Sequence, residues 1–141
     1  MMKIGVIVLA VAFTLASAYA ALIIVAPQVI AGSSYEARSG QKLESMQDSN
    51  GVATLLEETR RLGIFAATTA ILIWFILFFA FRKAERWAWW LFLIISIIVW
   101  GYGIVTNAIE GDMLNLILHI VCATINFVGL FLPVKAFFGK K

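Results

Sequence analysis

Residues 62–81 read LGIFAATTAILIWFILFFAF and residues 87–106 read WAWWLFLIISIIVWGYGIVT, with only RKAER between the two runs. Neither run contains Asp, Glu, Lys or Arg. A hydrocarbon core about 30 Å thick is crossed by roughly 20 apolar residues in a helix. This stretch therefore predicts two membrane-spanning helices joined by a short basic turn.

The rest of the chain has the same character, because uncharged apolar runs also occupy residues 4–30 and 113–134. Of the 141 residues, 62% are hydrophobic and only 13% are charged, against about 25% charged in a soluble domain. We therefore expect an all-α integral membrane protein, a four-transmembrane-helix bundle formed by a single domain over residues 1–141. Residues 31–61 are then its one longer extracytoplasmic loop.

The first apolar run has a second interpretation. Lys3, the apolar residues after it and either Ala16-Ser17-Ala18 or Ala18-Tyr19-Ala20 resemble a secretory signal with its cleavage site. The apolar region of a signal usually has about 7–15 residues, whereas this one continues through residues 21–25. We expect the segment to be retained as the first span, with its helix ending at Pro27.

The basic residues predict the orientation in the membrane. With the N-terminus inside, the inner segments hold seven Lys and Arg and the outer segments hold four, namely Arg38, Lys42, Arg60 and Arg61. The excess of Lys and Arg marks the cytoplasmic side. We therefore expect a multi-pass protein of the cell (plasma or inner) membrane with both termini in the cytoplasm. The inner seven are Lys3, Arg82, Lys83, Arg86, Lys135, Lys140 and Lys141.

The turn between the second and third spans predicts contact with lipid headgroups. It combines positive charge with amphipathic rings, at Arg82, Lys83, Arg86, Trp87 and Trp90. Such rings prefer headgroup depth, and the positive charge suits anionic lipids. Glu85 is flanked by two arginines, so we expect it to pair with them and fix a tight turn.

The predicted outer loop changes character near residue 50. Residues 32–51 are polar and rich in turn formers, which indicates loop. From Val52 the apolar residues return at helical spacing, with Ser49 or Asn50 as a candidate N-cap. Glu57 and Arg61 form an i, i+4 pair on this helix. It is either an extension of the second span or a short amphipathic helix on the outer surface.

The fourth predicted span carries the candidate site, a polar stripe at spacing 0, +4, +7 and +11: Asn115, His119, Cys122 and Asn126. This spacing keeps the four side chains on one face of a helix, and lipid cannot hydrogen-bond them. They either form interhelical hydrogen bonds or line a pocket for a lipophilic ligand. Candidate partners for interhelical bonds are Ser17, Tyr19, Thr68, Thr69 and Ser96.

Small residues predict close approach of helices. Ala12, Ala16 and Ala20 recur every four residues in the first span, and Gly101 and Gly103 lie in the third. Small residues at such spacing let the backbones of membrane helices approach one another. We expect tight packing along both spans.

Several activities are excluded by missing residue types. One cysteine, one histidine and spans without carboxylates supply no metal site and no thiol pair. A proton path normally adds Asp or Glu to His, and no nucleophile–base pair is apparent. The basic residues lie at the membrane ends rather than in a separate basic domain, so we expect no nucleic-acid partner.

The turn FRKAERWAWW at residues 81–90 resembles the one between helices two and three of small, uncharacterised four-helix prokaryotic membrane proteins. More distantly, the layout is similar to that of DoxX-like proteins, some of which are implied to be membrane subunits of quinone-linked oxidoreductases. The resemblance implies an architecture and no particular activity.

Two functions follow as expectations. The first is a non-enzymatic accessory or scaffold subunit, packed with other membrane subunits or with copies of itself and holding no cofactor. The alternative is a binder of a quinone or lipid in the helix bundle, as a subunit of an electron-transfer enzyme could be. The two differ in whether His119 faces a neighbouring side chain or a cavity.

Overall fold

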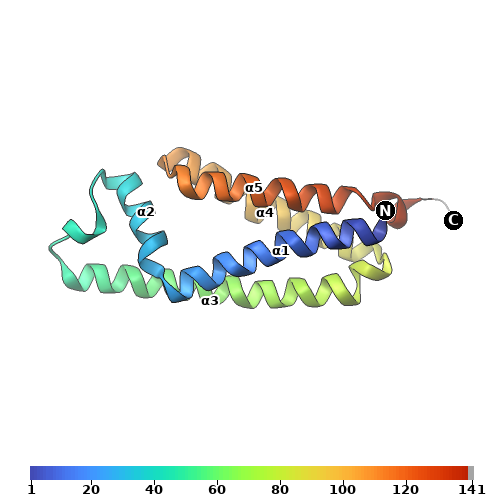
Figure 1. Ribbon diagram of the computed structural model, residues 1–141, viewed down its shortest axis with the longest axis horizontal. Helices are drawn as coiled ribbons and strands as arrows, with labels where there is room; N and C mark the ends of the chain where they lie inside the picture. Colours follow the sequence, from blue (N-terminus) through green and yellow to red (C-terminus); the bar gives the residue numbers. More distant parts are fainter. Residues whose placement is uncertain (140–141) are drawn as a thin grey trace.

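A computed structural model describes residues 1–139, which are helical apart from their turns (Figure 1). Four segments are long and apolar enough to cross a membrane, namely α1, α3, α4 and the pair α5–α6. The all-α prediction with four such helices is confirmed. The helices are α1 (Met2–Val25), α2 (Pro27–Ser39), η1 (Leu43–Ser45), α3 (Ser49–Phe79), η2 (Phe81–Lys83), α4 (Arg86–Glu110), α5 (Met113–Phe131) and α6 (Val134–Phe138).

The long helices pack in the order α3, α1, α5, α4. Helix α1 lies along both α3 and α5, and α5 lies along α4. Helices α3 and α4 make no extensive contact, although only the turn around η2 separates them in the chain. The N-terminus and α6 lie at one end of the molecule, here named the α6 end, and α2 lies at the other, the α2 end (Figure 1).

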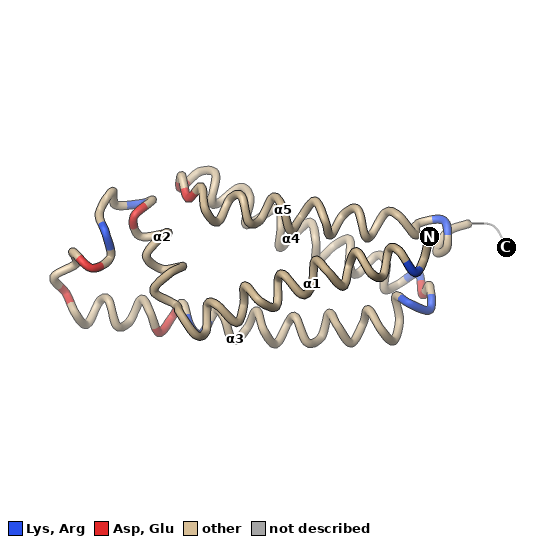
Figure 2. The backbone as a smooth tube through the Cα atoms, viewed as in Figure 1, with Lys and Arg blue, Asp and Glu red and all other residues tan. Residues whose placement is uncertain are grey.

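Charged side chains gather at these two ends. Figure 2 shows Lys, Arg, Asp and Glu at the α6 end and around α2, while the middle of the four long helices is free of them over the described residues. Charge is costly inside a bilayer, so this distribution fits helices whose middle lies in hydrocarbon. Lys140 and Lys141, two of the predicted cytoplasmic residues, lie outside the described residues.

The prediction of a loop over residues 31–61 is wrong for its first part, where the chain forms helix α2. Helix α1 ends at Val25, short of the predicted residue 30, and Pro27 starts α2 immediately afterwards. Proline is tolerated there because the first helical residues need no N–H donor. Gly40 ends α2 with φ 69°, a left-handed conformation that glycine adopts without strain.

The extension of the second span is confirmed, because α3 is one helix of 31 residues. At about 1.5 Å per residue it is roughly 46 Å long, and its first turns must project beyond a hydrocarbon core of about 30 Å. Its N-cap is Asp48, which accepts from the Asn50 N–H at 3.0 Å, rather than Ser49 or Asn50. The predicted Glu57–Arg61 pair is present at 2.7 Å.

The turn between α3 and α4 is held differently from the prediction. Glu85 accepts from Trp87 Nε1 at 2.6 Å, and no ion pair with either arginine is present in residues 1–139. Arg86 instead donates to the Phe137 carbonyl oxygen at 3.0 Å, which ties α4 to α6. The Trp87 indole is nearer to the Glu85 carboxylate than either arginine is. The carboxylate is therefore hydrogen-bonded at the start of α4 itself.

The best buried side chains lie toward the α6 end. There a cluster of apolar residues joins α1, α3, η2, α4, α5 and α6, and it includes Leu9, Leu77, Phe81, Trp89, Leu130 and Phe137. Aromatic contacts such as Phe81–Phe137, with ring centroids 4.7 Å apart, fill this end. The packing therefore fixes the helices at the α6 end, whereas the half toward α2 is hollow.

Candidate ligand site: a cavity between α3 and α4

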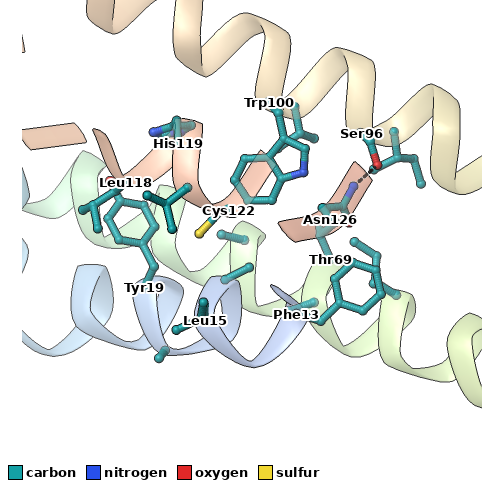
Figure 3. A pocket seen from close by; sticks show the side chains of 18 of the residues that line it. Phe13, Leu15, Tyr19, Thr69, Ser96, Trp100, Leu118, His119, Cys122 and Asn126 are labelled. Carbon is teal, nitrogen blue, oxygen red and sulfur yellow. Dashed lines mark hydrogen bonds between the residues drawn. The ribbon is translucent and has the colours of Figure 1, made fainter. Parts of the chain in front are cut away.

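A cavity of about 830 Å³ lies among all four long helices, and it is only partly enclosed. Its walls come from α1, α3, α4 and α5 (Figure 3). Three sides of this arrangement are formed by helix pairs that pack together, whereas α3 and α4 do not. The cavity is open between α3 and α4, where the lining residues Phe65 and Val99 are exposed, and the exposed residues Leu15 of α1 and Leu118 of α5 line it too.

Aromatic rings close the cavity toward the α6 end. Phe13 of α1 makes edge contacts with Trp74 of α3, at 6.3 Å between centroids, and with Phe92 of α4, at 5.4 Å. Phe13 and Phe92 belong to the buried cluster as well as to the cavity wall. The cavity is thus a pocket with a fixed floor.

The cavity wall is almost wholly apolar, with a few side chains able to hydrogen-bond: Tyr19, Thr69, Ser96, Trp100, His119, Cys122 and Asn126. None of the lining residues is Asp, Glu, Lys or Arg. Ligand sites for small molecules have volumes of about 300–1,000 Å³ and combine apolar walls with a few placed polar groups. In size and lining, this cavity matches such a site.

Three of the four predicted stripe residues, His119, Cys122 and Asn126, line the cavity. Asn115 does not. It is 2% exposed, accepts from Tyr19 Oη at 2.7 Å and donates to Asp112 Oδ2 at 2.7 Å. Asn115 therefore bonds to its neighbours outside the cavity lining, and its role as a ligand residue stays a prediction.

His119 faces both a neighbouring side chain and the cavity, which were the two alternatives predicted for it. Its Nδ1 lies 2.7 Å from the Asn115 carbonyl oxygen, so this nitrogen carries the hydrogen in the neutral ring and Nε2 is the acceptor. The ring makes edge contacts with Trp100 and Tyr19, at 5.9 and 6.2 Å between centroids. It also rests on Gly103, where a Cβ atom would overlap it. His119 thus packs α5 against α4 and borders the cavity.

Asn126 joins α5 to α4 through Ser96. Asn126 is 1% exposed, and its Nδ2 donates to Ser96 Oγ, while Ser96 Oγ donates to the Phe92 carbonyl oxygen at 2.6 Å. The one hydroxyl hydrogen is therefore used, which fixes the amide orientation. The interhelical bonds Asn126–Ser96 and Tyr19–Asn115 confirm two of the predicted partners. Thr68 and Thr69 instead donate to carbonyls of their own helix.

The structural role of Asp112 was not predicted from the sequence. It caps α5, accepting from the Asn115 N–H at 3.2 Å, and is 2% exposed. Ser33 and Ser34 of α2 donate to its two carboxylate oxygens at 2.8 and 3.0 Å. An acidic residue directly before an apolar helix is an N-cap signature that could have identified it. Its partners on α2 carry no such signal.

The carboxyl group of Asp112 lies in the turn between α4 and α5, outside the spans. Burial acts to raise its pKa, but the hydrogen bonds from Asn115, Ser33 and Ser34 outweigh burial and hold the pKa below its ordinary value. Arg38 and Glu110 add an ion pair at 2.7 Å between α2 and the end of α4. Together these bonds fasten α2 over the α4–α5 turn.

Groups of three or more His, Cys, Asp and Glu side chains placed to hold a metal are absent from residues 1–139. Comparison with protein-family models, with curated protein sequences and with solved structures finds no match to this chain. The resemblance to small four-helix and DoxX-like proteins therefore stays a prediction.

Proposed function

We propose that this protein binds one lipophilic molecule, a lipid or a quinone, in the cavity between α3 and α4. The observation that carries the proposal is the cavity of about 830 Å³ with apolar walls and few hydrogen-bonding groups. Since the opening lies between two apolar helices, the ligand enters sideways from the bilayer. Binding needs only the apolar walls and one or two hydrogen bonds, and it needs no catalytic group.

The proposed setting is the cell membrane, with both termini in the cytoplasm. Lys3, Arg82, Lys83, Arg86 and Lys135 gather at the α6 end with Glu85 as their one acidic neighbour among the described residues, which supports a cytoplasmic α6 end. Trp87 and Trp90 are about half exposed, at 52% and 51%, as suits rings at headgroup depth. Helix α2 then faces the outer side.

A second candidate is the non-enzymatic accessory or scaffold subunit. It is favoured by the exposed apolar face of α3, where Ile71, Leu72 and Phe75 are 60–70% exposed. A helix of another membrane subunit, or of a second copy, could pack on this face. The two candidates thus differ in whether the protein holds a small lipophilic molecule or a second protein chain.

Native mass spectrometry of the protein purified in mild detergent, with an absorption spectrum of the same sample, separates them. We expect one lipophilic molecule per chain, and its loss in Ala70→Phe, because Ala70 lines the cavity. Thr68→Phe is the matched control, because Thr68 is exposed on the same helix and does not line the cavity. A second protein chain in place of a small ligand would support the accessory subunit, and ligand retention in Ala70→Phe would contradict the proposed site.

A further inference from the structure

Several hydrogen-bonding atoms on the cavity wall have no protein partner within the described residues, Nε2 of His119 among them. Two of these atoms belong to neighbouring side chains. One is Oδ1 of Asn126, since Nδ2 of the same amide is used by Ser96. The other is Nε1 of Trp100, which forms no hydrogen bond, whereas Nε1 of Trp74 donates to Ser17 Oγ at 3.3 Å. Within residues 1–139, every side-chain polar atom that is out of reach of solvent has a partner, so the unpaired Oδ1 of Asn126 is reached from the cavity that this residue lines.

The two atoms belong to neighbouring parts of the wall. Trp100 follows Ser96 by four residues on α4, so the two side chains share a helix face. Asn126 is bonded to Ser96 from α5. Figure 3 shows the indole of Trp100 with its nitrogen on the side toward Asn126, both at the cavity. A free donor and a free acceptor therefore flank the same region of the cavity.

The ligand's head group must complement this pair. A carbonyl oxygen only accepts, so it would satisfy Trp100 and leave Asn126 unpaired. A hydroxyl group can do both, accepting from Trp100 Nε1–H and donating to Asn126 Oδ1. The lining has no Lys, Arg, Asp or Glu, and an ionised head group would be unpaired at this depth.

We propose that the ligand is a neutral lipophilic alcohol, in which a hydroxyl group bridges Trp100 and Asn126 and an apolar tail fills the rest of the cavity. A lipid alcohol and the reduced, quinol form of a quinone both have this chemistry, whereas an oxidised quinone lacks the donor. This inference rests on the proposed ligand-binding function. It makes the head group, rather than the tail, the part that the protein recognises.

The test compares two probes of nearly equal shape, hexadecanol and fluorohexadecane, added to delipidated protein at equal mole fraction in the detergent. Native mass spectrometry gives the fraction of chains with each probe bound. We expect hexadecanol to bind about tenfold more tightly, the size of effect that follows from leaving one buried polar group unpaired. The mass and absorption spectrum of the natural ligand distinguish a lipid alcohol from a quinol.

Two variants report on the two atoms. Trp100→Phe removes the donor and keeps an aromatic ring, and it should reduce the preference for hexadecanol severalfold. Asn126→Leu should abolish the preference, but it also breaks the bond to Ser96 and can unfold the protein, so Trp100→Phe is the decisive variant. Trp90→Phe is the matched control, because Trp90 lies on the same helix as Trp100, is 51% exposed and is outside the cavity lining.

The outcomes separate the inference from the proposed function. Equal binding of both probes, or an unchanged preference in Trp100→Phe, would overturn the hydroxyl assignment while leaving a lipophilic ligand in the cavity. Binding of neither probe, together with no ligand on the protein as purified, would overturn the ligand-binding function itself. Preference for hexadecanol that is lost in Trp100→Phe supports both.

Discussion

Gly103 shows how strongly one residue decides the shape of the site. The His119 ring of α5 lies directly on the α4 backbone at this position, where any Cβ atom would overlap it. The same contact places the ring against Trp100 and keeps Nδ1 within reach of the Asn115 carbonyl oxygen. A missing side chain on α4 therefore sets the position of the only histidine on α5.

Gly103→Ala should destabilise the protein by about 1–3 kcal/mol, because overpacking forces the ring or the helix to move. Gly101→Ala is the matched control, since nothing lies within 4 Å of the added Cβ. On helix propensity alone this control gains up to about 1 kcal/mol. Thermal unfolding in detergent compares the two, and equal melting temperatures would show that His119 does not rest on α4.

At the same scale, part of the site could be predicted from the sequence. The polar residues of α5 stand out against an apolar span, their spacing predicts one shared helix face, and three of the four lie on the cavity wall. Trp100 could not be found this way, because an aromatic residue within an apolar span breaks no pattern. Its free donor becomes visible only when the hydrogen bonds of its neighbours are known.

At the scale of elements, the spans were predictable and α2 was not. Length and hydropathy decide where a chain crosses a membrane, so α4 and α5 lie within a few residues of their predicted bounds. Helix α2 is polar and short, and its support comes from Asp112, which is 78 residues from Ser34 in the chain. Local pattern cannot reveal a helix that long-range hydrogen bonds hold.

The carboxylate of Asp112 should make the docking of α2 sensitive to acid. Its pKa is lowered in the folded protein, so the ionised form stabilises the fold at neutral pH. That contribution is lost as the pH falls below about 4, through the folded-state pKa. We expect Asp112→Asn to cost about 1–3 kcal/mol at neutral pH and to lack this part of the acid-induced loss.

Melting temperatures of both proteins between neutral pH and pH 3 measure this effect. Glu58→Gln is the control, because Glu58 pairs with Arg61 on the exposed surface, where ion pairs contribute little. If wild type and Asp112→Asn lose stability in parallel as the pH falls, Asp112 does not hold α2 through its charge.

At the scale of the whole molecule, the orientation can be checked with single cysteines. Cys122 is the one native cysteine, so Cys122→Ala provides a cysteine-free background. In whole cells, an impermeant maleimide should label Ser45→Cys near α2 and leave Lys83→Cys unlabelled until the membrane is permeabilised. Labelling of Lys83→Cys in intact cells would reverse the proposed orientation.

The lack of packing between α3 and α4 has a consequence for synthesis. When α4 emerges from the ribosome, its partner α5 is still inside the exit tunnel, and α3, which has already emerged, offers it little surface. The nascent chain then holds an unpacked helix until α5 arrives and joins α1 and α4 at once. A released chain that ends at residue 110 would expose α4 to membrane proteases and quality control, whereas one that ends after α3 would already hold the packed pair α1–α3.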